Sequence, residues 1–190
     1  SIETLMGAAD TAMYHAKPRG GGQHALFNHD LAARYQAKID TEKSLAEAVQ
    51  RGEFLLAFQP QMSMVTGEAV GAEALLRWNH PRDGLRLPST FIPVAEQTGV
   101  ISDIGDWVIA EIASTIGVWH RSGPRGRVAF NVSPRQLDRA DFFIRLRQAF
   151  DEQDAPLSMA ELEFTETAAM QANDTVLAEI AAIRDDGATI

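Results

Sequence analysis

Three oxygen-bearing side chains lie in or at the ends of apolar segments of this chain. Glu73 stands inside one apolar run, Asn131 ends a second, and Glu163 lies within a third. If these runs are neighbouring parallel strands, their carboxyl ends meet at one edge of a sheet and the three side chains converge there. Two carboxylates and one amide oxygen would then form a site for a hard cation such as magnesium, manganese or calcium.

Three further polar residues accompany this candidate cation site. Arg77 falls on the same face of its strand as Glu73, because side chains alternate along a strand. Its guanidinium could bind a phosphate oxygen through two hydrogen bonds. Gln59 ends the preceding apolar run, and Glu166 follows shortly after Glu163. A cation beside an arginine is suited to a small phosphate ligand.

A structural explanation is also open for each of these residues. Glu73 and Arg77 could form an ion pair along the strand. Asn131, which precedes a Val-Ser-Pro sequence, could be a turn residue, and Glu163 could face solvent on an edge strand. Gln59 could be an ordinary strand end, and Glu166 could be an ordinary residue of a loop or of a helix N-terminus. Only their shared position at strand ends favours a common site.

Composition restricts what such a site can be. The 190 residues include no cysteine, which excludes disulfides and thiolate metal sites, and the five histidines lack the paired spacing of metal ligands. The formal net charge of −9 argues against a broad surface for duplex nucleic acid. No apolar run approaches the roughly 20 residues that span a bilayer, and the first residues lack a signal-peptide pattern. We therefore expect a cytoplasmic segment without membrane contact, even if a longer parent protein is membrane-anchored.

Strands and helices alternate through the larger part of the chain. Thr66-Gly67 is a turn that joins the first two predicted strands as a hairpin. The later alternation indicates a parallel sheet with helices outside it, so we predict an α/β fold: a partial (β/α)8 barrel with an antiparallel first strand. Apolar runs predict strands over 54–58, 68–78, 128–131 and 161–165. Helical spacing predicts helices over 91–96, capped by Ser89 or Thr90, over 103–120, after Ser133-Pro134, and after Asn173 or Asp174.

Two helical segments precede these strands. Apolar residues at helical spacing predict a helix over 2–17, which Gly20–Gly22 ends, and a short strand over 24–27. A second helical pattern covers 30–51 and is interrupted at 40–43. Residues 1–29 are either a decoration of the main domain or the tail of a preceding one. We predict a linker helix over 30–51 and the main domain over 52–190.

An ordered set of motifs resembles the EAL-domain family of cyclic di-GMP phosphodiesterases over about residues 40–190. The motifs are Phe58-Gln59-Pro60-Gln61, Glu73-Ala74-Leu75-Leu76-Arg77-Trp78, Asn79-His80-Pro81, Phe91-Ile92-Pro93-Val94-Ala95-Glu96-Gln97-Thr98-Gly99, Asn131-Val132-Ser133 and Glu163-Phe164-Thr165-Glu166. Residues 8–17, followed by glycines, resemble the last helix of a GGDEF (diguanylate cyclase) domain, with His15 in place of the usual basic residue.

The resemblance implies a fold, a reaction and roles for six residues. The family is a (β/α)8 barrel with an antiparallel first strand, and it hydrolyses one phosphodiester of cyclic di-GMP to give linear pGpG with magnesium or manganese. It also implies a homodimer formed through this domain. The roles that it implies are metal ligands for Glu73, Asn131 and Glu163, substrate contacts for Gln59 and Arg77, and stabilisation of a loop for Glu166.

The resemblance also places part of the catalytic set outside this chain. In the family, the next strand carries an Asp-Asp pair, and later strands carry a lysine and a further glutamate; these would follow Ile190. Asp185 and Asp186 end a predicted helix, so we do not interpret them as that pair, and all three lysines precede the predicted barrel. We expect no hydrolysis by this chain alone. The alternative is a parent protein that binds cyclic di-GMP without cleaving it.

Overall fold

The computed structural model describes residues 29–124, 126–165, 168 and 172–190. The chain divides into two units, Ser1–Ala46 and Glu47–Ile190. The helix predicted over 2–17 and the strand over 24–27 lie outside the described residues. Helix α2 (His29–Ala48) belongs almost wholly to the first unit. It continues through residues 40–43, so the predicted interruption is wrong. Side-chain contacts one helical turn apart support it there, between Gln36 and Asp40 and between Lys38 and Glu42.

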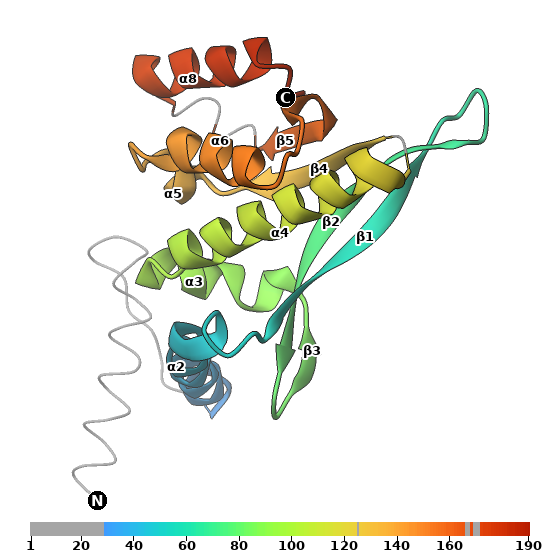
Figure 1. The fold of residues 1–190 in the computed structure, drawn as a ribbon. Helices are drawn as coiled ribbons and strands as arrows, with labels where there is room; N and C mark the ends of the chain where they lie inside the picture. The colour runs from blue at the N-terminus through green and yellow to red at the C-terminus, as the bar shows by residue number, and fades with distance from the viewer. Residues whose placement is uncertain (1–28, 125, 166–167, 169–171) are drawn as a thin grey trace, which may run out of the picture. The chain divides into compact units, whose positions relative to one another are not determined.

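The second unit is built on a sheet in which the strand order is β1-β2-β4-β5 (Figure 1). β1 is antiparallel to β2, whereas β2, β4 and β5 are parallel to one another. The short β3 pairs with the end of β2. The predicted α/β fold with an antiparallel first strand is confirmed. The strands are β1 (Phe54–Met62), β2 (Ala69–His80), β3 (Gly84–Arg86), β4 (Arg127–Val132) and β5 (Ala160–Phe164).

Two strand boundaries differ from the prediction. β1 does not stop at Gln59 but continues through Pro60, which an edge strand tolerates because its missing N–H need not break a ladder hydrogen bond. The second strand does not end at Trp78, as predicted, but reaches His80 and turns back into β3 as a second hairpin. The buried His80 Nδ1 accepts hydrogen bonds from the backbone N–H groups of Arg82 (3.3 Å) and Asp83 (3.1 Å), and these stabilise the turn.

Short helices follow β3 and β4 in the chain. The predicted cap at Ser89 or Thr90 is wrong, because Phe91 is the N-cap residue of α3 and makes no side-chain cap hydrogen bond. The helix extends to Thr98 and ends at Gly99, whose backbone is left-handed (φ 83°). The helix predicted after Ser133-Pro134 does begin there, and Ser133 is its N-cap residue. These elements are the 3-10 helix η2 (Pro88–Thr90), α3 (Ile92–Thr98) and α5 (Pro134–Leu137).

Longer helices cover one face of the sheet (Figure 1). The segment after Ser133, predicted as one helical stretch, is two helices, and Asn173 caps the last helix by accepting the N–H of Val176 at 3.0 Å. No helix within the described ranges is long and apolar enough to cross a membrane. The remaining elements are α4 (Ile101–Ser122), α6 (Phe142–Glu152), η3 (Leu157–Met159) and α8 (Asp174–Asp185).

The core lies between the sheet and these helices. Alternate residues of the strands enter it, and apolar residues of α4 and α6 meet them. Because Ala74 and Leu162 face this core, the residues on either side of them, among them Glu73 and Glu163, lie on the opposite face of the sheet. Fully or nearly fully buried members of the core are Val128, Phe130, Ile112, Ile116, Leu146 and Phe150.

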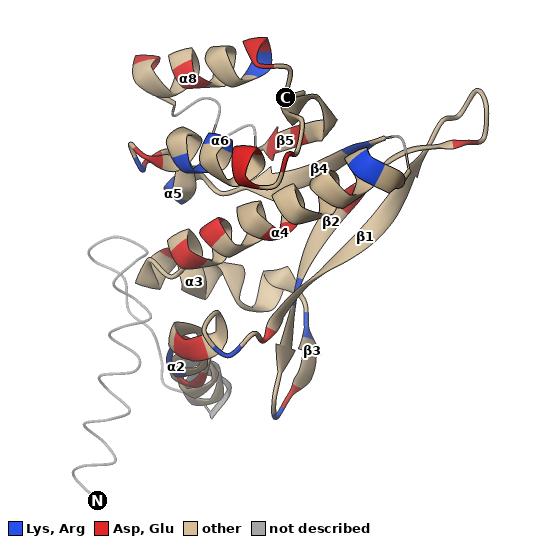
Figure 2. Ribbon diagram, in the orientation of Figure 1, with Lys and Arg blue, Asp and Glu red and all other residues tan. Residues whose placement is uncertain are grey.

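Acidic and basic residues are interspersed on the outer surfaces of α4, α6 and α8 (Figure 2). Arg147 of α6 forms ion pairs with Glu179 (3.2 Å) and Asp186 (2.8 Å) around α8. Arg145 forms another with Asp106 of α4 (2.9 Å). These partly exposed pairs join neighbouring helices but contribute little each to stability.

Candidate functional site

The strand register brings four of the six predicted site residues together as neighbours on one face of the sheet. Asn131 lies opposite Glu163 in the parallel pairing of β4 with β5. Its Nδ2 donates a hydrogen bond of 3.1 Å to Oε1 of Glu73 on β2. Gln59 lies opposite Glu73 in the antiparallel pairing of β1 with β2. Residues far apart in the chain therefore meet as adjacent positions on four neighbouring strands.

Negative charge accumulates around Glu163. Its pKa is raised above the usual value for a glutamate, first by burial, then by the charge of Glu73 and then by that of Glu161. In the described part of the chain, no ion pair involves Glu73 or Glu163. Two neighbouring carboxylates without a protein cation form an environment that a bound divalent cation would stabilise.

The chemistry of these donors fits a hard cation such as magnesium or manganese. Two carboxylates and the Oδ1 atom of Asn131 offer oxygen ligands, and the Nδ2 atom of that residue is turned toward Glu73. Among the described residues, no three His, Asp or Glu side chains gather to hold a metal ion. A cation at Glu73 and Glu163 would therefore use the amide oxygen together with water or an anionic ligand.

Arg77 lies further along β2 and is not paired with Glu73. Its Nη1 donates to the backbone carbonyl of Leu76 at 2.9 Å, and none of the described ion pairs includes it. It lies four positions beyond Glu73, which is about 13 Å along a strand at 3.3 Å per residue. The ion-pair explanation of these two residues is therefore wrong. β2 has left β4 at this point, since its pairing with β4 ends at Ala74 and Arg77 faces Leu55 of β1.

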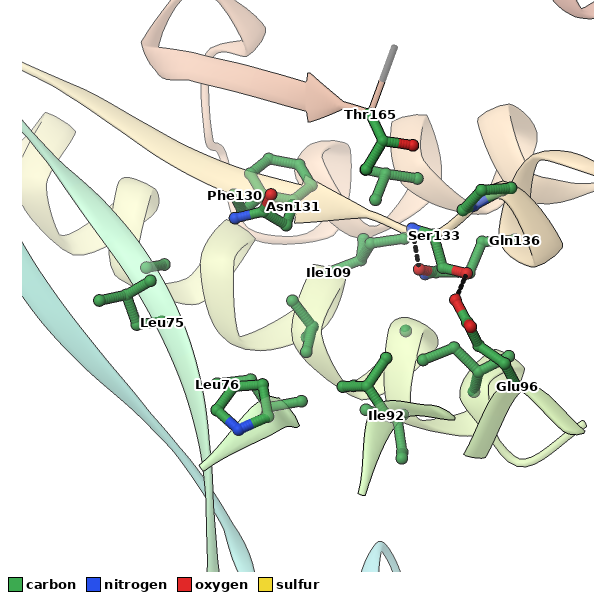
Figure 3. A pocket seen from close by; sticks show the side chains of 18 of the residues that line it. Leu75, Leu76, Ile92, Glu96, Ile109, Phe130, Asn131, Ser133, Gln136 and Thr165 are labelled. Carbon is green, nitrogen blue, oxygen red and sulfur yellow. Dashed lines mark hydrogen bonds between the residues drawn. The ribbon is translucent and has the colours of Figure 1, made fainter. Parts of the chain in front are cut away.

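A cavity of about 480 Å³, which the sequence did not predict, opens beside Asn131 (Figure 3). Its walls come from β2, β4, α3, α4 and α5, and most of them are apolar. Leu76, Ile92 and Ile109 point toward it in Figure 3. The polar side chains at its rim, besides Asn131, are Ser89, Glu96, Ser133, Gln136 and Thr165.

The turn that follows Asn131 contains a second feature that sequence reasoning missed. Ser133 Oγ donates a hydrogen bond of 2.6 Å to Oε1 of Glu96 on α3. The backbone N–H of Ser133 donates to Oε1 of Gln136 at 2.8 Å, which completes a capping box. The Ser-x-x-Gln spacing could have identified the contact with Gln136. No sequence signal could have identified Glu96. Glu166, the remaining predicted site residue, lies outside the described residues.

Relatives of this chain share most of its length. The signaling protein YkoW of Bacillus subtilis is 37% identical over 166 residues, which cover 87% of this chain and 21% of YkoW. The bifunctional diguanylate cyclase/cyclic di-GMP phosphodiesterase MucR of Pseudomonas aeruginosa is 36% identical over 174 residues, which cover 91% of this chain and 25% of MucR. The chain thus spans about a quarter or less of the length of these relatives.

The fold is similar to that of a solved structure of MucR. The PaMucR phosphodiesterase, in a complex with c-di-GMP, superposes with a TM-score of 0.74 at 33% identity, covering 78% of this chain and 61% of that one. A family model described as the EAL domain matches residues 42–190. Because that match covers more than half of the sequence, the chain belongs to the EAL-domain family.

Proposed function

We propose that this chain is part of a metal-dependent phosphodiesterase that hydrolyses cyclic di-GMP to linear pGpG. The observation that carries the proposal is the convergence of Glu73, Asn131 and Glu163 on one face of the sheet, with a 3.1 Å hydrogen bond between the first two. Membership of the EAL-domain family supports it. So does the similarity to MucR, a relative named as a cyclic di-GMP phosphodiesterase.

The two carboxylates and the amide oxygen of Asn131 would hold magnesium or manganese. When bound, such a cation lowers the pKa of a coordinated water and stabilises the charge that develops on the phosphorus oxygens. The pKa of Glu163 is raised by burial and by Glu73, and no ion pair among the described residues neutralises its carboxylate. The protein thereby supplies the negative charge that a cation requires, and Asn131 limits that charge to two carboxylates.

Arg77 and Gln59 would contact the substrate. The guanidinium of Arg77 forms one backbone hydrogen bond and no described ion pair, so most of its donors remain available for a phosphate oxygen. Gln59 is exposed and lies on the strand next to Glu73. Together they would hold the phosphodiester at the cation site for hydrolysis, in which a water oxygen bonds to phosphorus, one bond from phosphorus to a ribose oxygen breaks, and a proton of that water ends on the departing ribose oxygen.

The sequence motifs support further assignments within this proposal. Glu166, which follows the β5 motif, would stabilise a loop beside the site. Residues 1–29 would be the tail of a GGDEF domain, on the basis of the motif over 8–17, with a linker over 30–51 and the EAL domain from residue 52. The active form would be a cytoplasmic homodimer formed through the EAL domain.

A hydrolysis assay tests the proposal. The complete protein that the gene encodes would be incubated with cyclic di-GMP and manganese, and pGpG separated by chromatography. We expect Glu73→Ala to lower the rate at least about a hundredfold, because a metal ligand is lost. Glu111→Ala, which removes an exposed carboxylate of α4, is the matched control and should keep the rate. Binding of cyclic di-GMP without formation of pGpG would refute hydrolysis and favour a receptor.

A further inference from the structure

The turn between β4 and α5 is held by two side chains, Glu96 of α3 and Gln136 of α5. Ser133, the N-cap residue of α5, lies two residues after Asn131. Its hydroxyl donates to the Glu96 carboxylate of α3 at 2.6 Å and accepts the N–H of Arg135 at 3.3 Å. Hydrogen bonds to a carboxylate are short and strong, so the contact with Glu96 is the principal tie between this turn and α3.

The second tie, through Gln136, is packed into the protein. Gln136 accepts the backbone N–H of Ser133 at 2.8 Å, and its side chain is 7% exposed. It lies against Gly105 of α4, where an added Cβ would overlap the Gln136 amide. This side chain therefore has almost no freedom to move. The Ser133 backbone is anchored on the α4 side, and its hydroxyl is anchored on the α3 side by Glu96.

The Glu96 carboxylate also has a stable base. α3 buries Ala95 completely, next to Glu96, and the preceding Phe91 is also fully buried. Figure 3 shows Glu96 reaching Ser133 from the wall of the cavity opposite Asn131. Neither Glu96 nor Ser133 touches Glu73 or Glu163 through any described hydrogen bond, so any influence on the site passes through the turn.

We propose that Glu96 is a positioning residue, which through Ser133 fixes the end of β4 and keeps the Asn131 amide directed at Glu73. The assignment rests on the proposed function only in that Asn131 is there a metal ligand. Val132, the single residue between Asn131 and Ser133, is buried and paired with β5, so one fixed residue joins the Ser133 turn to Asn131. Outer partners of this kind commonly change metal affinity tenfold or more.

Hydrogen exchange of the Asn131 side-chain amide, measured by NMR on the metal-free 190-residue chain, tests this positioning directly. We expect Glu96→Ala and Ser133→Ala to speed exchange of the Nδ2 protons about five- to tenfold. Glu96→Gln keeps an oxygen that accepts from Ser133 and should stay within about twofold of the parent chain. Glu111→Ala, an exposed carboxylate on α4, is the matched control and should change nothing. The double variant that combines Glu96→Ala with Ser133→Ala should exchange no faster than Ser133→Ala alone, because both substitutions remove the same hydrogen bond.

An unchanged Asn131 exchange rate in Glu96→Ala overturns the inference, even if that variant unfolds more easily, because a merely structural role would lower stability without moving this signal. If Glu96→Ala does not fold, Ser133→Ala decides by the same measurement. Manganese affinity, followed by the electron paramagnetic resonance of free Mn²⁺, separates the two proposals. If the parent chain does not bind manganese, that result counts against the proposed function, whereas the exchange rate of the Asn131 amide still decides the role of Glu96.

Discussion

Replacing Asn131 by aspartate changes the charge of the candidate site with almost no change in shape. In the parent chain, Asn131 Nδ2 donates to Glu73 Oε1 at 3.1 Å, and Glu163 lies opposite Asn131 on β5. Asn131→Asp removes that donor and places a third carboxylate beside the two already present. The hydrogen bond to a charged group is lost, and it is replaced by repulsion between like charges.

The size of the effect follows from these contacts. Two unit charges 4 Å apart repel by about 1 kcal/mol in water and by about 4 kcal/mol at an effective dielectric constant of 20. Asn131 is exposed, so the value belongs near the lower limit. Adding a lost charge-assisted hydrogen bond, we expect Asn131→Asp to lower the free energy of unfolding by about 2 kcal/mol without metal. Manganese should recover most of this loss, because three carboxylates bind a cation more tightly than two.

Urea unfolding at neutral pH, in EDTA and in manganese, measures both effects. Asn79→Asp is the matched control: it adds the same charge to an exposed asparagine of β2 that pairs with Leu85, away from Glu163. The control should respond little to manganese. If Asn131→Asp is as stable as the parent chain in EDTA, or if manganese stabilises it no more than the control, the site does not concentrate negative charge as described.

Three other predictions rest on separate contacts. Glu163→Gln should make the metal-free chain more stable at neutral pH and weaken manganese binding at least about tenfold. Because the pKa of Glu163 is raised in the folded state, the folded state loses stability as pH rises from the ordinary glutamate pKa through the raised one. Urea unfolding measured against pH should show this fall in the parent chain and not in the variant. Gly105→Ala should lower the free energy of unfolding by about 1–3 kcal/mol, since its Cβ would displace Gln136, and an unchanged urea midpoint would contradict the packing described. Arg147→Ala should cost about 1 kcal/mol or less at low salt, with the difference shrinking in 1 M salt, because its ion pairs with α8 are partly exposed; a salt-independent loss would point to packing instead.

Periodicity predicted the part of the fold that depends on burial. Along β2, the buried Ala72, Ala74 and Trp78 alternate with the partly exposed Glu73 and Arg77, as a two-residue period requires. The faces of the strands were therefore predictable before their partners were known. Strand ends were less so: Pro60 suggested a stop, yet an edge strand accepted it, and the three residues of β3 are too few to give a periodic signal.

Contacts between elements could not be predicted in the same way. The hydrogen bond from Ser133 to Glu96 joins residues 37 positions apart, and only the packing of α3 beside the β4–α5 turn creates it. The cavity beside Asn131 likewise depends on how far α3 and α4 lie from the sheet, which apolar spacing does not encode. The absence of cysteine and the spacing of the histidines limited the expected metal ligands to oxygen donors, but only the register placed Asn131 opposite Glu163.

Under the proposed function, the choice of an amide at position 131 is explained by the demands of a metal-free and a metal-bound state. Without a cation, a carboxylate there would face Glu73 and Glu163 and add repulsion to a site in which the pKa of Glu163 is already raised. The amide instead donates Nδ2 to Glu73 and stabilises the metal-free strand ends, while its Oδ1 remains an oxygen donor for a cation. An aspartate would improve only the metal-bound state, and an apolar residue neither. Asparagine is therefore the side chain of this size that serves both states, and stability measured with and without manganese distinguishes those two contributions.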